Sequence, residues 1–194
     1  MPDLAATGSA RPLRADARRN RERILESARE VFSADGAEAQ MDDIALRAGV
    51  GVGTLYRHFP TKEALLLELV REKLRVFDDN VVDALASDDE AGAVFEALLR
   101  RNAEIASSDA VMQQMLAGTG DRLWSRLQVE RDRLDAHTSE LIERARLAGA
   151  VRADLKASDV AMMMCGLCAT MAHGGAGFDW RRYLDLSLEG LTSQ

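Results

Sequence analysis

Aromatic residues, cysteine and proline are all scarce in this sequence. Of its 194 residues, 5% are aromatic, two are cysteines and three are prolines. Cys165 and Cys168 lie three positions apart in an apolar segment, which offers no disulfide framework and favours a reducing cytoplasm. Together with His173 they fall short of the four ligands of a structural zinc site. We therefore predict no metal and no other cofactor, and we interpret the cysteines as packing residues.

Long hydrophobic runs and catalytic motifs are absent as well. The longest apolar run, Ala161 to Ala172, is too short to cross a bilayer, and the N-terminal residues lack the pattern of a secretory signal. The HGGAG at 173–177 has no accompanying G-x-S-x-G elbow, and the GVGVG at 49–53 lacks the lysine of a P-loop. We expect no membrane partner and no enzymatic activity.

The net charge of −7 is distributed unevenly along the chain. Residues 1–60 carry nine arginines and nine acidic residues, whereas residues 61–194 carry sixteen basic and twenty-three acidic residues. Within the first part, residues 11–23 hold six arginines and two acidic residues. A basic arm on an acidic body can still steer towards a polyanion, although charge alone is equally compatible with a solvated tail.

Apolar residues recur with helical spacing along the whole chain, and no stretch alternates with the period of a strand. A first helix is predicted from Asp16, as its N-cap, to Gly36, with a stripe that includes Ile24 and Phe32. The sequence Ser87 to Glu90 has the form of a capping box. The further predicted helices cover about 41–48, 52–59, 61–86, 87–105, 111–116, 121–148, 158–172 and 179–191.

The stretch MDDIALRAGVGVGTLYRHF, residues 41–59, contains two helices that are each too short to be stable alone in water. Two short helices joined by a tight turn with glycine are typical of a helix-turn-helix. Leu55 and Phe59 face the first helix, and the outward side of the second helix carries no acidic residue, so it can approach a major groove closely. That outward side consists of Gly51, Val52, Gly53, Thr54, Tyr56 and Arg57.

The segment from Arg23 to Leu69 resembles the TetR family of transcriptional regulators. The resemblance rests on ILESAREVFSADG, on MDDIALRAGVGVGTLYRHFPTKEALL and on the spacing between them, about a quarter of the chain. The remainder is similar in layout only. The resemblance implies a homodimer that binds a palindromic double-stranded DNA operator. It also implies a small molecule that enters the C-terminal body and releases the DNA, with repression as the commoner outcome.

The resemblance also implies individual DNA contacts. Thr54 and Tyr56 would contact DNA, His58 and Lys62 would touch phosphates, and the three residues 51–53 would lie nearest the base edges. Gln40 stands where the family has a capping Thr or Ser, and a glutamine caps poorly. Gly51 and Val52 stand where a Ser and a Lys are usual, which removes a hydroxyl and a positive charge.

The arginine-rich first helix can offset this weaker phosphate anchoring through minor-groove or phosphate contacts, as homeodomain arms do. Its candidates are Arg14, Arg18, Arg19 and Arg21, of which one or two are expected to contribute. The predicted DNA-binding residues are Gln40, Gly51, Val52, Gly53, Thr54, Tyr56, Arg57, His58, Lys62, Arg18 and Arg19.

These observations predict an all-α protein of about nine helices. Residues 1–14 are expected to be a disordered arm, 15–60 a three-helix DNA-binding domain, and 61–194 a ligand-binding and dimerisation domain. A pocket between helices is mainly apolar with a few polar groups. Its candidates, each also compatible with ordinary core, are Phe77, Phe95, Leu99, Asn102, Met112, Met115, Leu116, Trp124, Leu127 and His137.

The last two predicted helices carry more apolar surface than one core can bury. A helix that is apolar on all sides is buried on all sides, so one side is expected to face a second copy across a twofold axis. A buried hairpin in a monomer is the alternative. Leu186 lies off the main stripe of the last helix. The predicted interface residues are Met162, Cys165, Ala169, Ala172, Trp180, Tyr183, Leu184 and Leu188.

Two alternatives to a ligand-responsive repressor stay open. One is a DNA-binding regulator without small-molecule control, which a filled, cavity-free body would favour. The other is a helical enzyme or ligand carrier with a merely structural N-terminal bundle, which predicts no specific DNA binding. The effector, the operator and the regulated genes are not encoded in any motif of the chain.

Overall fold

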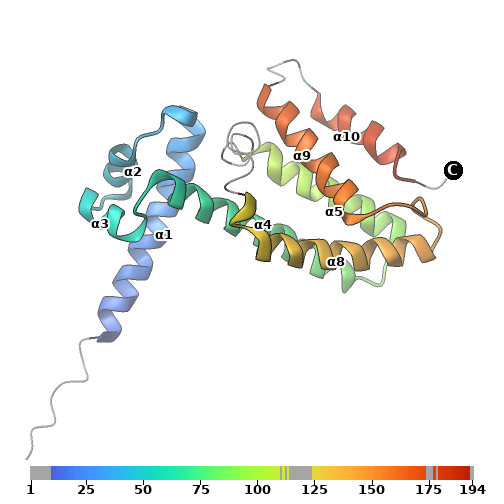
Figure 1. Cartoon of the computed structure of the whole chain (residues 1–194), viewed down its shortest axis with the longest axis horizontal. Helices are drawn as coiled ribbons and strands as arrows, with labels where there is room; N and C mark the ends of the chain where they lie inside the picture. Colours follow the sequence, from blue (N-terminus) through green and yellow to red (C-terminus); the bar gives the residue numbers. More distant parts are fainter. Residues whose placement is uncertain are drawn as a thin grey trace, which may run out of the picture. The chain divides into compact units, whose positions relative to one another are not determined.

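The chain is described by a computed structural model that covers residues 10–109, 111, 113, 124–173, 177 and 179–192. Within these ranges it forms eight α-helices and one short 3-10 helix, with no β-strand (Figure 1). The prediction of an all-α fold is confirmed; most of the expected helix 111–116 lies outside the described residues. No helix in the described part combines the length and apolar character that a bilayer crossing requires.

The chain divides into two compact units, Met1–Leu66 and Leu67–Gln194. The division falls inside helix α4 (Lys62–Leu85), a few residues beyond the domain limit predicted at residue 60. Thr61 caps this helix as predicted, because its Oγ1 accepts a hydrogen bond from the N–H of Ala64 at 3.0 Å.

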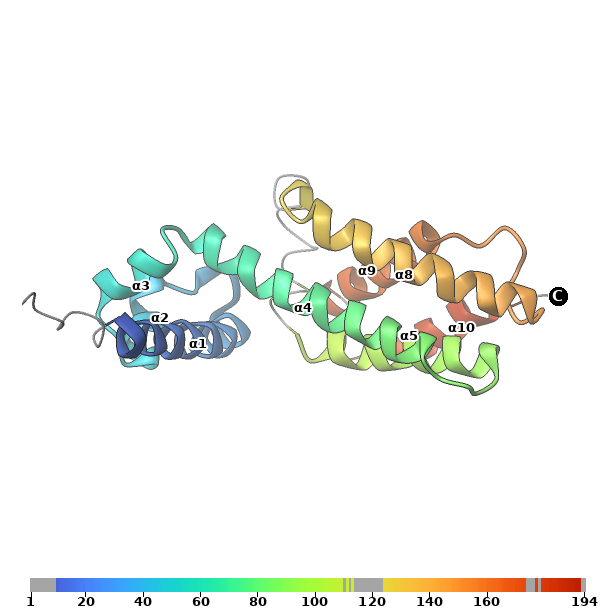
Figure 2. The ribbon, with the colours of Figure 1, turned by 90° about the horizontal axis from the view of Figure 1, so that it is seen from below.

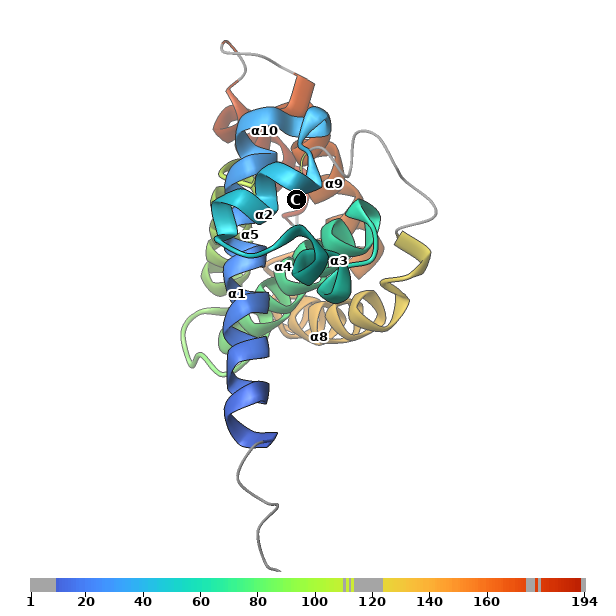
Figure 3. The same ribbon diagram turned by 90° about the vertical axis from the view of Figure 1, so that its left-hand side faces the viewer.

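The first unit is built on α1 (Ala10–Asp35), which is longer than predicted. Disorder of residues 10–14 and a cap at Asp16 are both wrong, while residues 1–9 lie outside the described residues. The reason is that Pro12 occupies the first turn, where no backbone bond is lost, among good helix formers. The predicted apolar stripe, which begins at Ile24, is buried. The N-terminal half of α1 extends beyond α2 (Met41–Ala48) and α3 (Val52–His58), as Figure 3 shows.

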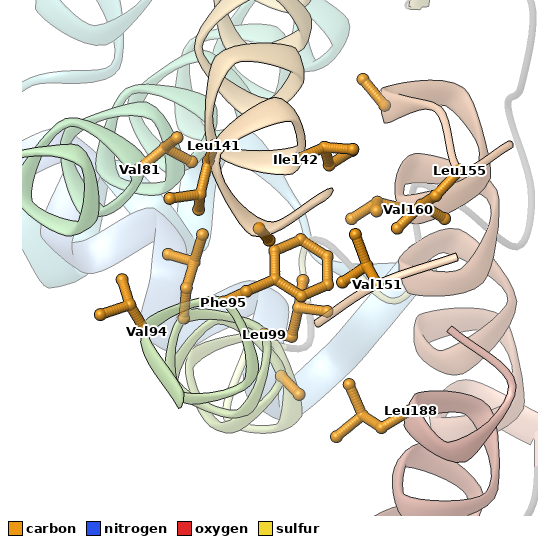
Figure 4. Packing of buried hydrophobic residues seen from close by; sticks show 14 of the residues in the cluster. Val81, Val94, Phe95, Leu99, Leu141, Ile142, Val151, Leu155, Val160 and Leu188 are labelled. Carbon is orange, nitrogen blue, oxygen red and sulfur yellow. The ribbon is translucent and has the colours of Figure 1, made fainter. Parts of the chain in front are cut away.

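The second unit contains the rest of α4, α5 (Ala91–Ser107), α8 (Gln128–Leu147), α9 (Ala157–His173) and α10 (Trp180–Glu189). All five helices contribute to one hydrophobic core (Figure 4). Examples of the core side chains are Val81, Phe95, Leu141, Val160 and Leu188.

One predicted helix start in this unit is wrong, and another lies outside the described residues. The capping box from Ser87 does not form: Glu90 is the N-cap of α5, and its carboxylate accepts from the N–H groups of Gly92 at 2.8 Å and Ala93 at 2.7 Å. A carboxylate that satisfies two orphan N–H groups leaves Ser87 no role in the cap. Helix α8 begins at Gln128 after a turn, later than the predicted start at Asp121, which itself lies outside the described residues.

Helices α4 and α8 are joined by three polar contacts between partners that are each 59 residues apart in sequence. Arg71 Nε donates to Glu130 Oε1 at 2.7 Å, Asp78 Oδ1 lies 2.7 Å from His137 Nδ1, and Arg144 Nη1 donates to the Leu85 carbonyl at 3.3 Å. A constant offset means that the two helices run parallel, in the same direction in Figure 2. Successive contacts are two helical turns apart, the repeat of coiled-coil packing.

Candidate nucleic-acid interface and ligand cavity

The turn between α2 and α3 depends on Gly49. Its φ of +61° is left-handed, which costs a side-chain-bearing residue but not glycine. Its carbonyl accepts a hydrogen bond from Arg23 Nη2 of α1 at 3.3 Å, and a Cβ built at Gly49 would lie 2.5 Å from that nitrogen. The turn is therefore closed against α1. Ile44, Ala45 and Leu55 are completely buried behind it, as the helix-turn-helix pattern predicts.

The outer side of α3 is open. Val52 and Tyr56 are exposed by 41% and 44%, and Gly51, Gly53 and Arg57 are exposed as well, while Thr54 is half-buried. A Cβ added at Gly51 or Gly53 would meet no atom of the chain within 4 Å. The two glycines are thus not required by the protein's own packing. They leave the backbone accessible to a molecule outside it.

His58 and Lys62, which are predicted to contact phosphates, both pack against other parts of the protein. His58 is half-buried, and its Nε2 is buried without a hydrogen-bond partner among the described residues. Burial lowers the pKa of His58 below its usual 6.5, and the nearby charges of Arg57 and Arg21 lower it further. The ring is therefore neutral at pH 7, and only its other nitrogen remains for a phosphate.

The ammonium of Lys62 donates to the carbonyl of Ala39 at 2.6 Å and lies over the ring of Phe32, 5.5 Å from its centroid. A phosphate contact by Lys62 therefore competes with these internal contacts. Gln40 is the N-cap of α2 but makes no side-chain cap bond, as expected, and its amide instead donates to the Glu38 carbonyl.

Two arginines in the N-terminal half of α1, Arg18 and Arg19, are solvent-exposed. Arg18 and Arg19 form ion pairs with Glu22 and Asp16 on the same helix, each between partners three or four positions apart. Such exposed pairs contribute little free energy, so the guanidinium groups can exchange them for phosphates. Arg21 packs differently: its guanidinium lies over the ring of Phe59, 5.5 Å from the centroid.

The second unit contains an open cavity with two adjoining chambers of about 380 Å³ and about 90 Å³. Both chambers are lined by residues of α4, α5, α8 and α9. The shared lining residues are Phe77, Leu134, Asp135, Ala161 and Met164.

The predicted pocket residues divide into three groups. Phe77 and Trp124 line the larger chamber, and Phe95, Leu99 and Asn102 line the smaller one together with Phe77. Leu127 and His137 are not among the lining residues: Leu127 is fully buried core, and His137 is bonded to Asp78. Met112, Met115 and Leu116 lie outside the described residues.

Sequence reasoning missed the charged lining residues Arg131 and Asp135, which stand one helical turn apart on α8. Their spacing in the sequence shows that they lie on one face of a helix. It does not show which part of the protein that face contacts. Cys165 and Cys168 also line the larger chamber. Burial raises the pKa of both thiols, that of Cys168 to about 12, so they are neutral, polarisable lining groups.

The outer sides of α9 and α10 retain apolar surface. Met162 is 69% exposed and Ala172 is exposed as well, whereas Ala169, Trp180 and Tyr183 are half-buried. Cys165 is partly accessible, but it borders the larger chamber. The assignment of Leu184 and Leu188 to an intersubunit surface is wrong, since both lie in the subunit's own core. The broad stripe of α10 faces inwards, and the residue left outside it, Leu186, is 51% exposed.

Comparisons with known proteins agree with this architecture. Residues 24–69 match the family described as bacterial regulatory proteins, tetR family, and residues 79–193 match the SbtR-like transcriptional regulator C-terminal domain. An HTH-type transcriptional regulator of Staphylococcus aureus is 42% identical over 66 residues, 34% of this chain and 36% of that protein. The chain thus spans about a third of the length of the curated relatives it matches.

Solved structures match over nearly the whole chain. A TetR transcription regulatory protein from Mycobacterium vanbaalenii is 33% identical, with a TM-score of 0.64, over 93% of this chain and 99% of that one. The FadR repressor of Thermus thermophilus, solved with lauroyl-CoA, is 26% identical, with a TM-score of 0.62, over 87% and 91%. On its two domain matches and this likeness, the chain belongs to the TetR family of DNA-binding transcriptional regulators.

Proposed function

We propose that this protein is a homodimeric, cytoplasmic repressor that binds a palindromic operator and releases it when a small molecule enters the cavity of its second unit. The observation that carries the DNA-binding part is the open outer side of α3. Two glycines there have unoccupied space where a Cβ would stand, and Tyr56 projects beside them. A surface of this kind can approach base edges closely.

The DNA contacts of this proposal centre on residues 51–57 of α3. Val52 can contact a thymine methyl, Thr54 a phosphate or a base, and Tyr56 the backbone or a thymine methyl. His58, Lys62 and the exposed Arg18 and Arg19 would supply phosphate contacts at the margins. Because two such helices act together, the half-sites lie on one face of the duplex, about 34–36 Å apart or a multiple of this.

The cavity supports control by a small molecule. A filled body would favour a regulator without an effector, but the second unit holds chambers of about 380 Å³ and about 90 Å³ lined mainly by apolar side chains. The larger chamber alone falls within the range of ligand pockets. For ligand to release DNA, it must bind the DNA-free conformation more tightly than the DNA-bound one.

The test begins with duplexes selected from a random pool by the full-length protein. We expect Tyr56→Ala to lose binding to the selected operator by at least about tenfold, as a lost anchoring contact predicts, while sedimentation still shows a dimer. Val129→Ala, at an exposed position of the second unit, is the matched control and keeps full affinity. Unchanged operator binding by Tyr56→Ala contradicts the assignment of this surface. Failure to select any duplex favours the enzyme or carrier alternative.

A further inference from the structure

The cavity carries two charged lining residues, Arg131 and Asp135, in otherwise mostly apolar surroundings. Both are half-buried and lie one turn apart on α8. Arg131 lines only the larger chamber, whereas Asp135 lines both chambers. The two charges are therefore distributed unevenly along the cavity, and this asymmetry can orient a ligand.

Arg131 has no carboxylate partner among the described residues. Its guanidinium instead lies over the ring of Trp124, with Cζ 5.6 Å from the centroid. The neighbouring Arg133 differs, because its Nε is 2.7 Å from Asp78 Oδ2. A guanidinium held on an aromatic face keeps its N–H edge available, and that edge matches a carboxylate with two parallel hydrogen bonds.

Asp135 restricts where such an anion can lie. No hydrogen bond or ion pair engages its carboxylate within the described part of the chain. This carboxylate borders both chambers, but Arg131 offsets its charge only in the larger one, so an anionic group is disfavoured in the smaller chamber and an uncharged apolar group is not. Phe95, Leu99 and Val160 complete an apolar surface in that chamber.

We propose that the effector is an amphipathic organic anion, whose anionic head pairs with Arg131 in the larger chamber and whose apolar chain extends into the smaller one. The statement that this ligand is the effector rests on the proposed function. The expected binding of an amphipathic anion rests only on the residues that line the cavity. A free carboxylic acid and an acyl thioester of an anionic carrier share this chemistry. Asp135 acts as the group that sets the direction of binding.

The test is isothermal titration calorimetry of the full-length protein without DNA, with decanoate, decanol and decylammonium as probes of equal chain and different head. We expect decanoate to bind at least about tenfold more tightly than decanol, the range of a charge-assisted contact. Arg131→Gln removes this difference while decanol binding is unchanged, which shows that the cavity is intact. Arg101→Gln, an exposed arginine on α5, is the control and keeps the preference.

A second variant tests the orientation. Asp135→Asn removes a repulsive charge without changing size, so decanoate binding should stay the same or tighten by a few fold. Weaker decanoate binding in this variant overturns the assigned direction. Equal binding of decanoate and decanol by the unaltered protein, or tighter binding of decylammonium, overturns the proposed ligand class.

Two further measurements separate this inference from the proposed function. Decanoyl-CoA in place of decanoate distinguishes the thioester source from the free acid, and loss of its binding in Arg131→Gln supports the same anionic contact. Operator release is then titrated with whichever probe binds. Binding that depends on Arg131 without operator release supports the ligand chemistry and contradicts ligand control. Release by decanol as effectively as by decanoate contradicts the ligand class and leaves ligand control standing.

Discussion

Asp78 Oδ1 lies 2.7 Å from His137 Nδ1, and this contact joins the middle of α4 to the middle of α8. The other oxygen of the same carboxylate lies 2.7 Å from Arg133 Nε. The Asp78 side chain is only 5% exposed, so these two partners replace water around a buried charge. Both helices also line the ligand cavity. The pair therefore sets the spacing of two cavity walls.

We predict that Asp78→Asn destabilises the fold by about 2 kcal/mol, because it replaces the buried carboxylate and weakens its charge-assisted contact with Arg133. Urea unfolding measures the effect. Asp79→Asn is the matched control, since Asp79 is the exposed neighbour on the same helix. If both variants lose the same stability, the cluster contributes no more than a surface charge.

Gly53→Ala is predicted to keep the stability of the protein and to lose operator affinity by about tenfold or more. A methyl group at this position meets nothing in the chain, and alanine is the better helix former, so the free energy of unfolding rises by no more than about 1 kcal/mol. Any loss of binding must then arise from contact with DNA. Fluorescence anisotropy with the selected operator measures it.

Gly49→Ala supplies the contrast for this experiment. It is predicted to lower the free energy of unfolding by about 1–2 kcal/mol, because its backbone is left-handed and Arg23 must move to admit a side chain. A Gly53→Ala variant that is destabilised to the same extent would mean that the glycine serves the fold and not a DNA contact.

Gly51→Ser is predicted to strengthen operator binding. The serine restores a hydroxyl at a position where its Cβ meets nothing in the chain, and a hydrogen bond to a phosphate contributes about 1.5 kcal/mol, or about tenfold in affinity. Affinity measured for both proteins at several salt concentrations tests this. A hydroxyl donor, unlike an added lysine, should leave the slope of affinity against salt nearly unchanged. Gly51→Ala, which adds the Cβ alone, should give no gain.

The cap of α5 makes stability depend on pH in a defined direction. Two backbone N–H groups hold the pKa of the Glu90 carboxyl below its ordinary value of 4.5. A depressed pKa in the folded state means that the contribution is fully present above pH 4.5 and is lost as pH falls through the lowered value. Glu90→Gln should therefore be less stable than the unaltered protein at neutral pH, with the difference shrinking in acid. Thermal unfolding across this range measures it, and a difference that grows in acid contradicts the cap.

Local features of the chain allowed much of the first unit to be predicted. The stripe of α1, the left-handed Gly49 and the cap at Thr61 each depend on residues within about one or two helical turns. The start of α1 differs from the prediction because the first turn of a helix tolerates a proline, here Pro12. On α10 the apolar stripe was predicted correctly, but it packs against the subunit's own core and not against a second subunit.

Local patterns in the sequence predicted the helices, the helix-turn-helix and the open glycine-bearing side of α3, because periodicity, caps and turn residues act over a few neighbouring positions. The folded structure was needed to show that Arg131 and Asp135 line a cavity, that Asp78 contacts His137 and that Leu186 rather than Leu188 is exposed. Each of these depends on how one helix is rotated against another. That rotation depends on how entire helix faces pack against each other. On α4 and α8 these faces bring together residues that are 59 positions apart in the sequence.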